Sequence, residues 1–544
     1  MIKDVMRSDV MKTRRGSFMK KRFCMGFAIL LMMVAMVQMT VGAAGATVTA
    51  SHCFISGTDV NVIAAGPVAQ SDTGMYYLFE LKVYEAGVGA RQDYCAAVPA
   101  AEAVHFTTPL NYNTANSKLT SRFVITAYRG GMYVPISNEM YITNPEVLAT
   151  KALGNPAKTK KGLIADWQYV SDLKDLNVGY ATYTMDINTF FTAGGVNYTY
   201  NGKTYSFNSV QVAAYDVLCK MFTDAGCNLV MVLTNDYTPA TADLVPAAAR
   251  IPNIYNYSFN IQEKVPAEKL EALMSFLASR YNGGSHGAIH SWIIGNEVNN
   301  NYPGHFAGNM GVTEFSVDYA KQFRVMYNAI KSHNSSAKVY INIDQRWNFE
   351  DGTPNQYSCK SFLNNFASYV KTTGDINWGL SFHPHAVPMT NCQFWNVPAD
   401  YAAMRLIDHT ENTKFVTMQN MHVMTDYMQK LEMLSPTGTI RDIIISEIGF
   451  TSTGAYATNE QIQAAAMVYA YKIADQLPIQ AFIVHKHVDA SSEALEGLAY
   501  GLRTPTYKKY AYTVYKYMDT GNTAYTDFAL PIIGASSWAQ LGVK

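Results

Sequence analysis

The sequence predicts an α/β fold, a (β/α)8 TIM barrel preceded by a small all-β sandwich domain. From residue 162 to 520, short apolar runs alternate with amphipathic helical segments, which is typical of a parallel barrel. From residue 47 to 150, short alternating apolar runs are separated by Gly, Asn and Ser, which is typical of an antiparallel sandwich. Residues 151–161 are expected to link the two domains, and residues 521–544 to pack back onto the barrel.

Eight short apolar runs bounded by turn residues are the candidate barrel strands. In chain order they are residues 163–165, 178–187, 228–233, 291–297, 338–343, 378–383, 443–447 and 481–485. Helices are expected between them. One covers residues 266–281, because Pro266 suits a first helical turn, and another begins at Thr458 with Gln461 as its capping box. A doubly wound sheet is the alternative, but no Gly-rich phosphate loop follows any strand.

Length, charge and the N-terminus limit the classes of function. The chain has 544 residues, of which 49% are hydrophobic, and a formal net charge of zero, so we expect a large core and no nucleic-acid partner. Residues 1–46 are typical of a signal peptide, with a basic segment around Lys21, an apolar run and small residues up to Ala46. The protein is therefore expected to be secreted or exposed on the cell surface. An uncleaved segment would instead anchor it to the membrane.

Cysteine usage fits an extracellular protein. Six cysteines follow the signal segment, namely Cys53, Cys95, Cys219, Cys227, Cys359 and Cys392. We expect one disulfide between Cys53 and Cys95 and another between Cys359 and Cys392, because an even number in local groups is typical of exported proteins. Cys219 and Cys227 flank a buried turn and are either bonded or free thiols.

Two glutamates end two of the predicted strands. Glu297 follows the apolar run that starts at Ser291, and Glu447 ends the run that starts at Asp442. The carboxyl ends of barrel strands meet at one rim, so the two side chains are expected to face each other at about 5 Å. Hydrolysis of a glycosidic bond with retention of configuration requires such a pair, one carboxyl protonated and the other ionised, and no cofactor. The alternative is that both are structural, as a helix cap and a salt-bridged rim residue.

The order of the strands adds a resemblance. Glu297 closes the fourth predicted strand and Glu447 the seventh, so residues 162–518 resemble the retaining glycoside hydrolases of clan A, whose Asn-Glu pair and nucleophile occupy these positions. The resemblance implies that Glu297 is the acid/base and Glu447 the nucleophile. It also implies that Asn296 binds the sugar 2-hydroxyl. Because regular alternation would put Asn296 and Glu297 on opposite faces, a bulge or strand end is expected there.

The chain also departs from the clan. Asp186 stands where the second strand of the clan ends in arginine, and His485 where the eighth ends in tryptophan. Residues 293–299 and 485–489 are similar to those of an uncharacterised family of secreted bacterial barrel proteins, a domain of unknown function. The resemblance therefore implies no particular sugar, and Asp186 is a candidate substrate contact.

Two histidine pairs have two interpretations. His383 with His385, and His485 with His487, each place imidazoles on one face of an extended strand. In the glycosidase hypothesis His383, His385 and His485 contact sugar hydroxyls. In the alternative, a metal-dependent hydrolase, both pairs bind a metal, together with Asp489. We favour sugar contacts and no metal, because barrel metallohydrolases of the amidohydrolase type carry His-x-His on the first strand, where this chain has none.

Aromatic and polar residues in the predicted rim loops suit an oligosaccharide or polysaccharide. Trp347 and Trp395 could stack on sugar rings, with Asp344 and Gln345 as polar partners. A third class, a non-catalytic carbohydrate-binding surface protein, is disfavoured because it would not need both glutamates. The sandwich domain is expected to brace the barrel, with glycan binding as the alternative.

Overall fold

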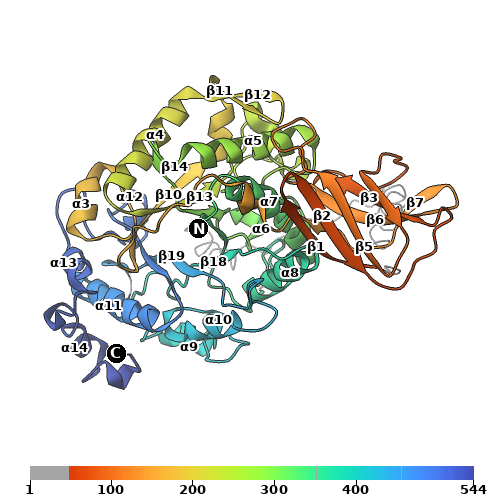
Figure 1. Ribbon diagram of the computed structural model, residues 1–544. Helices are drawn as coiled ribbons and strands as arrows, with labels where there is room; N and C mark the ends of the chain where they lie inside the picture. Colours follow the sequence, from red (N-terminus) through yellow and green to blue (C-terminus); the bar gives the residue numbers. More distant parts are fainter. Residues whose placement is uncertain (1–47, 351, 455, 457, 544) are drawn as a thin grey trace, which may run out of the picture. The chain divides into compact units, whose positions relative to one another are not determined.

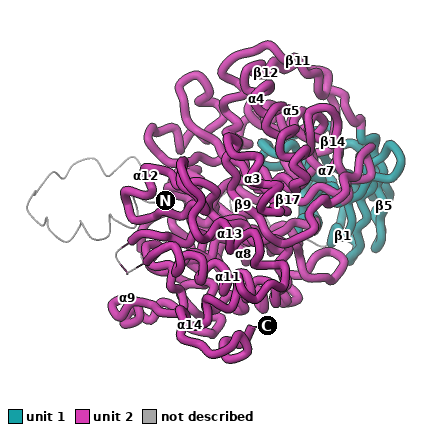
Figure 2. Tube along the Cα trace, turned by 90° about the vertical axis from the view of Figure 1, so that its left-hand side faces the viewer, with its two compact units in different colours: residues 1–110, 121–143, 372–374 teal, residues 111–120, 144–371, 375–544 magenta. Residues whose placement is uncertain are grey.

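The computed structural model describes residues 48–350, 352–454, 456 and 458–543. The predicted signal segment, residues 1–46, lies outside this range. Within it, no helix has the length and apolar character needed to cross a membrane. The chain forms two compact units, shown in different colours in Figure 2. Unit 1 contains the described residues up to 110 with 121–143 and 372–374, and unit 2 contains 111–120, 144–371 and the described residues from 375 onward.

Unit 1 is all-β and contains two antiparallel sheets (Figure 1). One sheet has the order β1 (Thr49–Ser56), β2 (Asp59–Ala65), β5 (Ala103–Pro109). The other has the order β4 (Ala96–Pro99), β3 (Met75–Leu81), β6 (Arg122–Arg129), β7 (Met132–Pro135), and β8 (Met140–Tyr141) pairs with β6. In β5, buried Val104, Phe106 and Thr108 alternate with exposed residues. This period of two is the pattern that predicted an N-terminal β domain.

Unit 2 contains a closed barrel of eight parallel strands surrounded by helices. Its strands are β9 (Lys161–Ile164), β10 (Tyr180–Asp186), β13 (Asn228–Thr234), β16 (Ser291–Ile294), β17 (Lys338–Ile343), β18 (Gly379–Phe382), β19 (Ile443–Gly449) and β20 (Ala481–His485), and β20 pairs with β9 to close the ring. The predicted TIM barrel is confirmed, and all eight predicted segments form strands in the predicted order. Each is recognisable because barrel strands are covered on both faces and are therefore apolar along their length.

The barrel interior is filled by side chains from most of its strands. They are Tyr180, Val230, Val232, Ile293, Tyr340, Ile444, Ala481 and Ile483. Gly379 of β18 makes room for one of them, because a Cβ at this position would lie 2.4 Å from the Tyr340 ring. The lower barrel is thus a solid core, and ligands are restricted to its ends.

The helices of unit 2 follow the strands. The longest are α4 (Ser209–Asp224), α5 (Lys264–Arg280), α7 (Val312–Lys331), α8 (Cys359–Thr372) and α11 (Glu460–Gln476). Shorter ones are α3 (Val170–Asp175), α6 (Asn301–Gly304), α9 (Ala399–Ala403), α10 (His422–Tyr427), α12 (Ser491–Ala494), α13 (Tyr510–Tyr517) and α14 (Ala529–Ile533). The cap of α11 is Asn459 and not Thr458 as predicted, because the Asn459 side chain accepts the N–H of Ile462. In the tail, Trp538 packs beside Tyr469 of α11.

Two small hairpins in unit 2 were not predicted. One is β11 (Gly195–Tyr200) with β12 (Lys203–Asn208), inserted between β10 and α4. The other is β14 (Asn282–Gly284) with β15 (Gly287–Ala288), which precedes β16.

The predicted disulfides are absent. None of the described cysteines is bonded to another. The Cys359 thiol instead donates to the Asp344 carbonyl at 3.1 Å, and the Cys95 thiol donates to the Leu78 carbonyl at 3.2 Å. Burial raises the pKa of Cys392 to about 12, which keeps this thiol protonated. The prediction of disulfides Cys53–Cys95 and Cys359–Cys392 is therefore wrong for this structure.

Candidate functional site

Glu297 lies just beyond the carboxyl end of β16, in a strained backbone. The strand ends at Ile294, and Gly295 and Glu297 both have positive φ, +79° and +46°. A Cβ on Gly295 would lie 2.6 Å from Val298, so only glycine fits. The N–H of Glu297 donates to Asn342 Oδ1 at 2.5 Å, which helps to hold the turn. A buried carboxylate in a left-handed conformation is a feature that folds retain chiefly at functional sites.

Glu447 lies in an irregular part of β19. The register with β20 shifts between Ile445 and Ile448, which is a β-bulge. In a regular strand Ser446 and Glu447 would point to opposite faces. With the bulge, Ser446 Oγ lies 2.9 Å from His383 Nε2 and Glu447 Oε1 lies 3.3 Å from His385 Nε2. The bulge therefore lets Ser446 face His383 while Glu447 faces the neighbouring His385.

A buried polar layer supports His383 from below. Asn342 of β17 donates through Nδ2 to Ser381 Oγ at 2.7 Å, and Ser381 Oγ contacts Ser446 Oγ at 2.5 Å. His383 Nε2 lies 3.0 Å from Asn342 Nδ2. Because Asn342 Oδ1 accepts the Glu297 N–H, its Nδ2 faces the imidazole, and an amide N–H can only donate. In the neutral ring, Nε2 therefore accepts and the proton lies on Nδ1, 3.0 Å from Glu297 Oε1.

The histidines hold Glu447 in its ionised form. Burial opposes ionisation, but the charges of His485 and His383 and the contact with His385 outweigh it, so the pKa of Glu447 lies far below its usual range. Burial also opposes protonation of His383, yet the charges of Glu447 and Glu297 raise its pKa above the usual value. The site thus couples a permanent carboxylate to an imidazole that readily carries a proton.

His485 extends this chain of groups to a further carboxylate. It is the last residue of β20, where its Nδ1 lies 3.7 Å from Glu447 Oε1 and its Nε2 lies 3.5 Å from Glu493 Oε1. Lys486 also contacts Glu493, at 2.8 Å. Glu493 belongs to α12 and is a site residue that the sequence did not reveal. Burial opposes its ionisation, but His485 and Lys486 lower its pKa.

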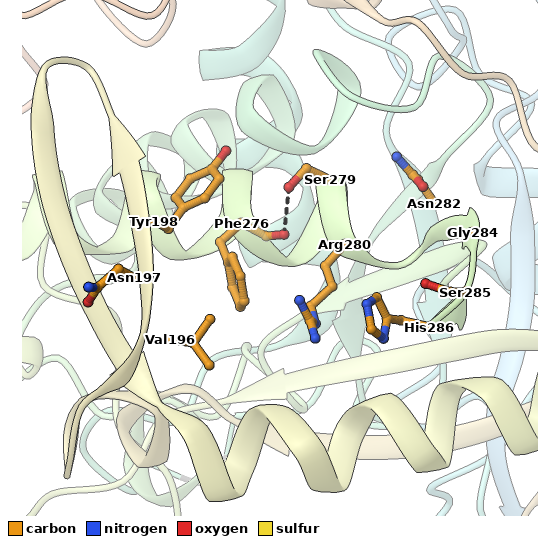
Figure 3. A pocket seen from close by; sticks show the side chains of 10 residues that line it. All are labelled: Val196, Asn197, Tyr198, Phe276, Ser279, Arg280, Asn282, Gly284, Ser285 and His286. Carbon is orange, nitrogen blue, oxygen red and sulfur yellow. Dashed lines mark hydrogen bonds between the residues drawn. The ribbon is translucent and has the colours of Figure 1, made fainter.

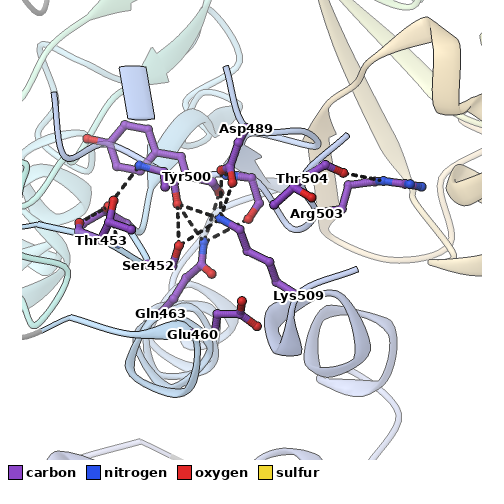
Figure 4. Close-up of polar contacts among 12 residues, drawn as sticks. Ser452, Thr453, Glu460, Gln463, Asp489, Tyr500, Arg503, Thr504 and Lys509 are labelled. Carbon is purple, nitrogen blue, oxygen red and sulfur yellow. Dashed lines mark hydrogen bonds and ion pairs between the residues drawn. The ribbon is translucent and has the colours of Figure 1, made fainter. Parts of the chain in front are cut away.

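A buried polar network holds the loop that carries Glu493 (Figure 4). Lys509 Nζ lies 2.7 Å from Asp489 and donates to Ser452 Oγ at 2.9 Å. Gln463 of α11 donates to the Gly501 carbonyl at 3.1 Å. These bonds tie the segment that follows β20 to α11. They place Asp489 in a structural ion pair. The metal hypothesis had instead required Asp489 to lie beside the histidines.

Loss of Lys509 is expected to destabilise the protein strongly. The side chains of Lys509 and Asp489 are only 2% and 12% exposed, so Lys509→Met would leave a nearly buried carboxylate without its cation. Such a change costs about 3–5 kcal/mol of unfolding free energy. The matched control is Lys220→Met, which breaks the exposed pair with Asp224 and should cost about 0.5 kcal/mol. Urea unfolding compares the two, and equal losses would show that the network does not stabilise the fold.

The two tryptophans predicted to stack on sugar rings pack against other aromatic residues. Trp347 is fully buried, donates to the Glu411 carbonyl at 3.1 Å and packs edge-on against Tyr427, so it has no open face for a ligand. Trp395 is half-buried, and its ring packs against Phe394 and Tyr469.

Of the two predicted polar partners, Asp344 is engaged by the protein itself and Gln345 is partly accessible. Asp344 is buried and accepts from Asn299 Nδ2 at 2.9 Å and Asn300 Nδ2 at 2.8 Å. It therefore orders the loop after Glu297. The carbonyl of Gln345 accepts the Trp347 N–H at 2.8 Å, and its side chain is half-buried.

The structure separates the four histidines of the metal hypothesis. His487 is buried beside Asp172 of α3, with Nε2 3.2 Å from a carboxylate oxygen, and is not part of the group at Glu447. Ligand atoms of Glu297, His383 and His385 do come within 4.8 Å of one another. His385 Nε2 faces Glu447 Oε1, and its Nδ1 is buried without a hydrogen bond. Among the residues that the structure describes, these three form the cluster that could hold a metal ion.

The remaining predicted residues lie near the same rim. Asp186 ends β10, and its carboxylate accepts from the Thr234 hydroxyl. Asn296 is half-buried between Gly295 and Glu297. Burial and the charges of Glu447, Glu297, Asp186 and Glu493 raise the pKa of Tyr255, a tyrosine in the loop after β13.

A surface hollow of about 430 Å³ lies away from these residues (Figure 3). It is lined by β11, the end of α5 and the β14–β15 hairpin, including Tyr198, Phe276, Arg280 and His286. Because β15 precedes the start of β16 and Glu297 follows its end, the hollow and the glutamate lie at opposite ends of that strand.

The fold and this group of residues define a TIM-barrel protein with a carboxylate–histidine site at the carboxyl rim. Residues 154–541 match a family described as a family of unknown function (DUF5722), and the chain belongs to this family. No curated protein matches the chain.

Among solved structures, three similar ones are glycosidases. A family 39 glycoside hydrolase from Bacteroides cellulosilyticus WH2 has 13% identity over 84% of this chain and 80% of its own, with a TM-score of 0.43. A glucosidase from Croceicoccus marinus has 13% identity over 68% and 69%, with a TM-score of 0.42. A family 1 β-glucosidase from Thermotoga maritima has 12% identity over 65% and 85%, with a TM-score of 0.41.

Proposed function

We propose that the protein hydrolyses a glycosidic bond of an oligosaccharide or polysaccharide with retention of configuration. The observation that carries the proposal is the pair of largely buried carboxylates just beyond β16 and near the carboxyl end of β19, joined through His383 and His385. A low-dielectric site with one permanently ionised carboxylate is suited to a double displacement. The export predicted from residues 1–46 belongs to this proposal, so the substrate is extracellular.

Glu447 acts as the nucleophile. His385 and His485 both contact its Oε1, so Oε2 is the oxygen that attacks the anomeric carbon and forms the glycosyl ester. The histidines stabilise the carboxylate before attack and receive it again after hydrolysis of the ester. Ionisation of Glu447 is retained throughout the neutral range because its pKa is strongly lowered.

Glu297 acts as the acid and then as the base. Its proton passes to the leaving oxygen while the bond to the anomeric carbon breaks, and in the second step Glu297 takes a proton from the water whose hydroxide attacks that carbon. His383 orients the carboxyl by the bond from Nδ1 to Oε1, which leaves Oε2 to face the leaving group.

A metal-dependent hydrolase is the second candidate. The observation that favours it is the cluster of Glu297, His383 and His385, together with the buried Nδ1 of His385, which makes no hydrogen bond. A transition metal held there would activate water. The cluster differs from the four-histidine set expected from the sequence, because His487 and Asp489 are engaged elsewhere.

Chelator treatment is expected to leave the activity unchanged. The measurement is turnover of aryl glycosides and polysaccharides by the purified protein, with and without EDTA. The variants His385→Ala and Glu447→Ala are measured under the same conditions. Under the glycosidase proposal EDTA has no effect and Glu447→Ala is inactive. Loss of activity with EDTA, its return with a divalent metal, and an active Glu447→Ala would replace the glycosidase proposal by the metal one.

A further inference from the structure

Unit 1 carries a cluster of four tyrosine rings on the sheet that contains β3, β6 and β7 (Figure 1). The ring centroid of Tyr133, in β7, lies 4.9 Å from that of Tyr77, 5.0 Å from that of Tyr128 and 5.9 Å from that of Tyr94. The rings meet edge-on or tilted, as attractive aromatic pairs do. They come from three strands and from the segment between β3 and β4, so the fold gathers them from distant parts of the sequence.

The exposure of this tyrosine cluster increases from Tyr77 to Tyr94. Tyr77 is 8% exposed and belongs to a hydrophobic core cluster with Phe79. Tyr128 and Tyr133 are half-buried and pack against that core. Tyr94 is 44% exposed. The rings therefore have an apolar backing that holds them and a surface that a ligand can reach.

The position of Tyr94 is fixed by both of its neighbours in the chain. The Asp93 carboxylate forms a bidentate pair with Arg91, at 2.9 Å from Nε and 2.8 Å from Nη2. The N–H of Cys95 donates to the Leu78 carbonyl of β3 at 2.8 Å. Tyr94 is thus held in place although its ring is open to solvent. A ligand that stacks on it need not first order the segment, which favours recognition.

The cation beside the cluster is already paired. Arg91 lies 6.0 Å from the ring centroid of Phe79, and that ring lies 5.0 Å from Tyr133. Besides Asp93, the Arg91 guanidinium contacts Glu85 at 3.1 Å. An anionic ligand would meet two carboxylates here and would have to displace one of them from Arg91, whereas an uncharged ligand disturbs neither pair. Charge complementarity therefore favours a neutral ligand.

The exposed apolar area is too small for a stable protein partner. Among the described residues of unit 1, the exposed large hydrophobic side chains are Val68, Tyr94 and Met132. Stable protein–protein interfaces bury about 800 Å² on each partner, contributed by roughly 20–30 residues. A sugar ring needs far less, an aromatic ring for its flat C–H face and polar groups for its hydroxyls. Tyrosine supplies both, so the cluster suits a carbohydrate better than a protein.

We propose that Tyr94, Tyr128 and Tyr133 form a binding surface for uncharged glycan chains on unit 1. It is separate from the candidate site at Glu297 and Glu447, which belongs to unit 2. The inference goes beyond the proposed hydrolysis, because binding at the tyrosines needs neither glutamate. It gives the sandwich domain a role in glycan binding.

The test is affinity electrophoresis of the full-length protein in gels that contain a neutral polysaccharide, with xyloglucan, galactomannan and mixed-linkage β-glucan as probes. The protein carries Glu447→Ala, so that the polymer is not degraded. At least one of these polymers should retard it. A second substitution, Tyr94→Ala, should raise the dissociation constant roughly tenfold because the stacking ring is lost, and Tyr94→Phe should retain most of the affinity. Tyr510→Ala is the control, since Tyr510 is an exposed tyrosine of unit 2.

Four outcomes would overturn the binding surface. They are equal retardation of Tyr94→Ala and its parent, no retardation in any neutral gel, stronger retardation by dextran sulfate or polygalacturonate, and self-association of the protein that Tyr94→Ala abolishes. Turnover of aryl glycosides by the wild-type protein tests the proposed hydrolysis separately. If turnover is absent while retardation depends on Tyr94, the binding surface stands and the hydrolysis is wrong.

Discussion

Glu447→Ala is expected to lower kcat by a factor on the order of 10⁵ on an aryl glycoside with a good leaving group, because no other described carboxylate occupies the nucleophile position. Added azide should restore part of the activity by entering the space that the carboxylate vacates. The rescued product should then be the glycosyl azide of inverted configuration, since only one displacement has taken place.

The control for this variant is Glu411→Ala. Glu411 is an exposed carboxylate that pairs with Lys360 and Lys430, and its loss should leave turnover unchanged. If Glu447→Ala retained the wild-type rate on every substrate that the protein cleaves, Glu447 would not be the nucleophile. The inactive Glu447→Ala variant should still fold, and its circular dichroism spectrum should match that of the wild-type protein.

The effect of Glu297→Ala on kcat is expected to depend on the leaving group. With a poor leaving group, kcat should fall by roughly 10²–10⁴, because departure of the oxygen needs a proton from Glu297. With a good leaving group the first step should persist while hydrolysis of the glycosyl ester slows, so that an early burst of product appears. Azide should accelerate the second step and give the glycosyl azide of retained configuration.

If Glu297→Ala lowered kcat equally for good and poor leaving groups, the acid/base role of Glu297 would be contradicted. The conservative variant Glu297→Gln separates charge from shape. It keeps the side-chain volume and the contact with His383 but cannot transfer a proton, so it should resemble Glu297→Ala in its dependence on the leaving group.

The fold was predictable because its main signals are local. Each barrel strand is buried on both faces and so reads as an apolar run, and the eight runs alternate with helical segments. The hairpin of β11 and β12 was missed because its alternating residues, such as Tyr198 and Tyr205, lie between two elements that already fit a strand and a helix. The disulfides were predicted from cysteine number, which does not reveal that Cys359 is directed toward Asp344.

The site was predictable where a residue ends a strand. Glu297, His383, Glu447 and His485 lie at or just beyond strand ends, and the structure brings them together. Trp347 was misplaced because sequence cannot distinguish a loop tryptophan that faces solvent from one that packs under the loop. Glu493 was missed because it lies in α12, beyond the end of β20, where loop geometry decides which side chain enters the site.

Polar residues inside apolar strands were an unused signal. Asn342, Ser381 and Ser446 interrupt the apolar runs of three successive strands and form the layer beneath His383. A polar side chain within a buried strand must be satisfied by another, so polar residues on three neighbouring strands indicate a built network.

Identification of the covalently modified residue tests the central claim most directly. The protein is treated with an activated 2-deoxy-2-fluoro glycoside of a sugar that it cleaves, which slows hydrolysis of the glycosyl ester, and the peptides are then sequenced by mass spectrometry. The account predicts that the fluorosugar is attached to Glu447 and that Glu447→Ala is not labelled. Attachment to another residue, or complete absence of a covalent adduct while the substrate is turned over with inversion, would contradict it.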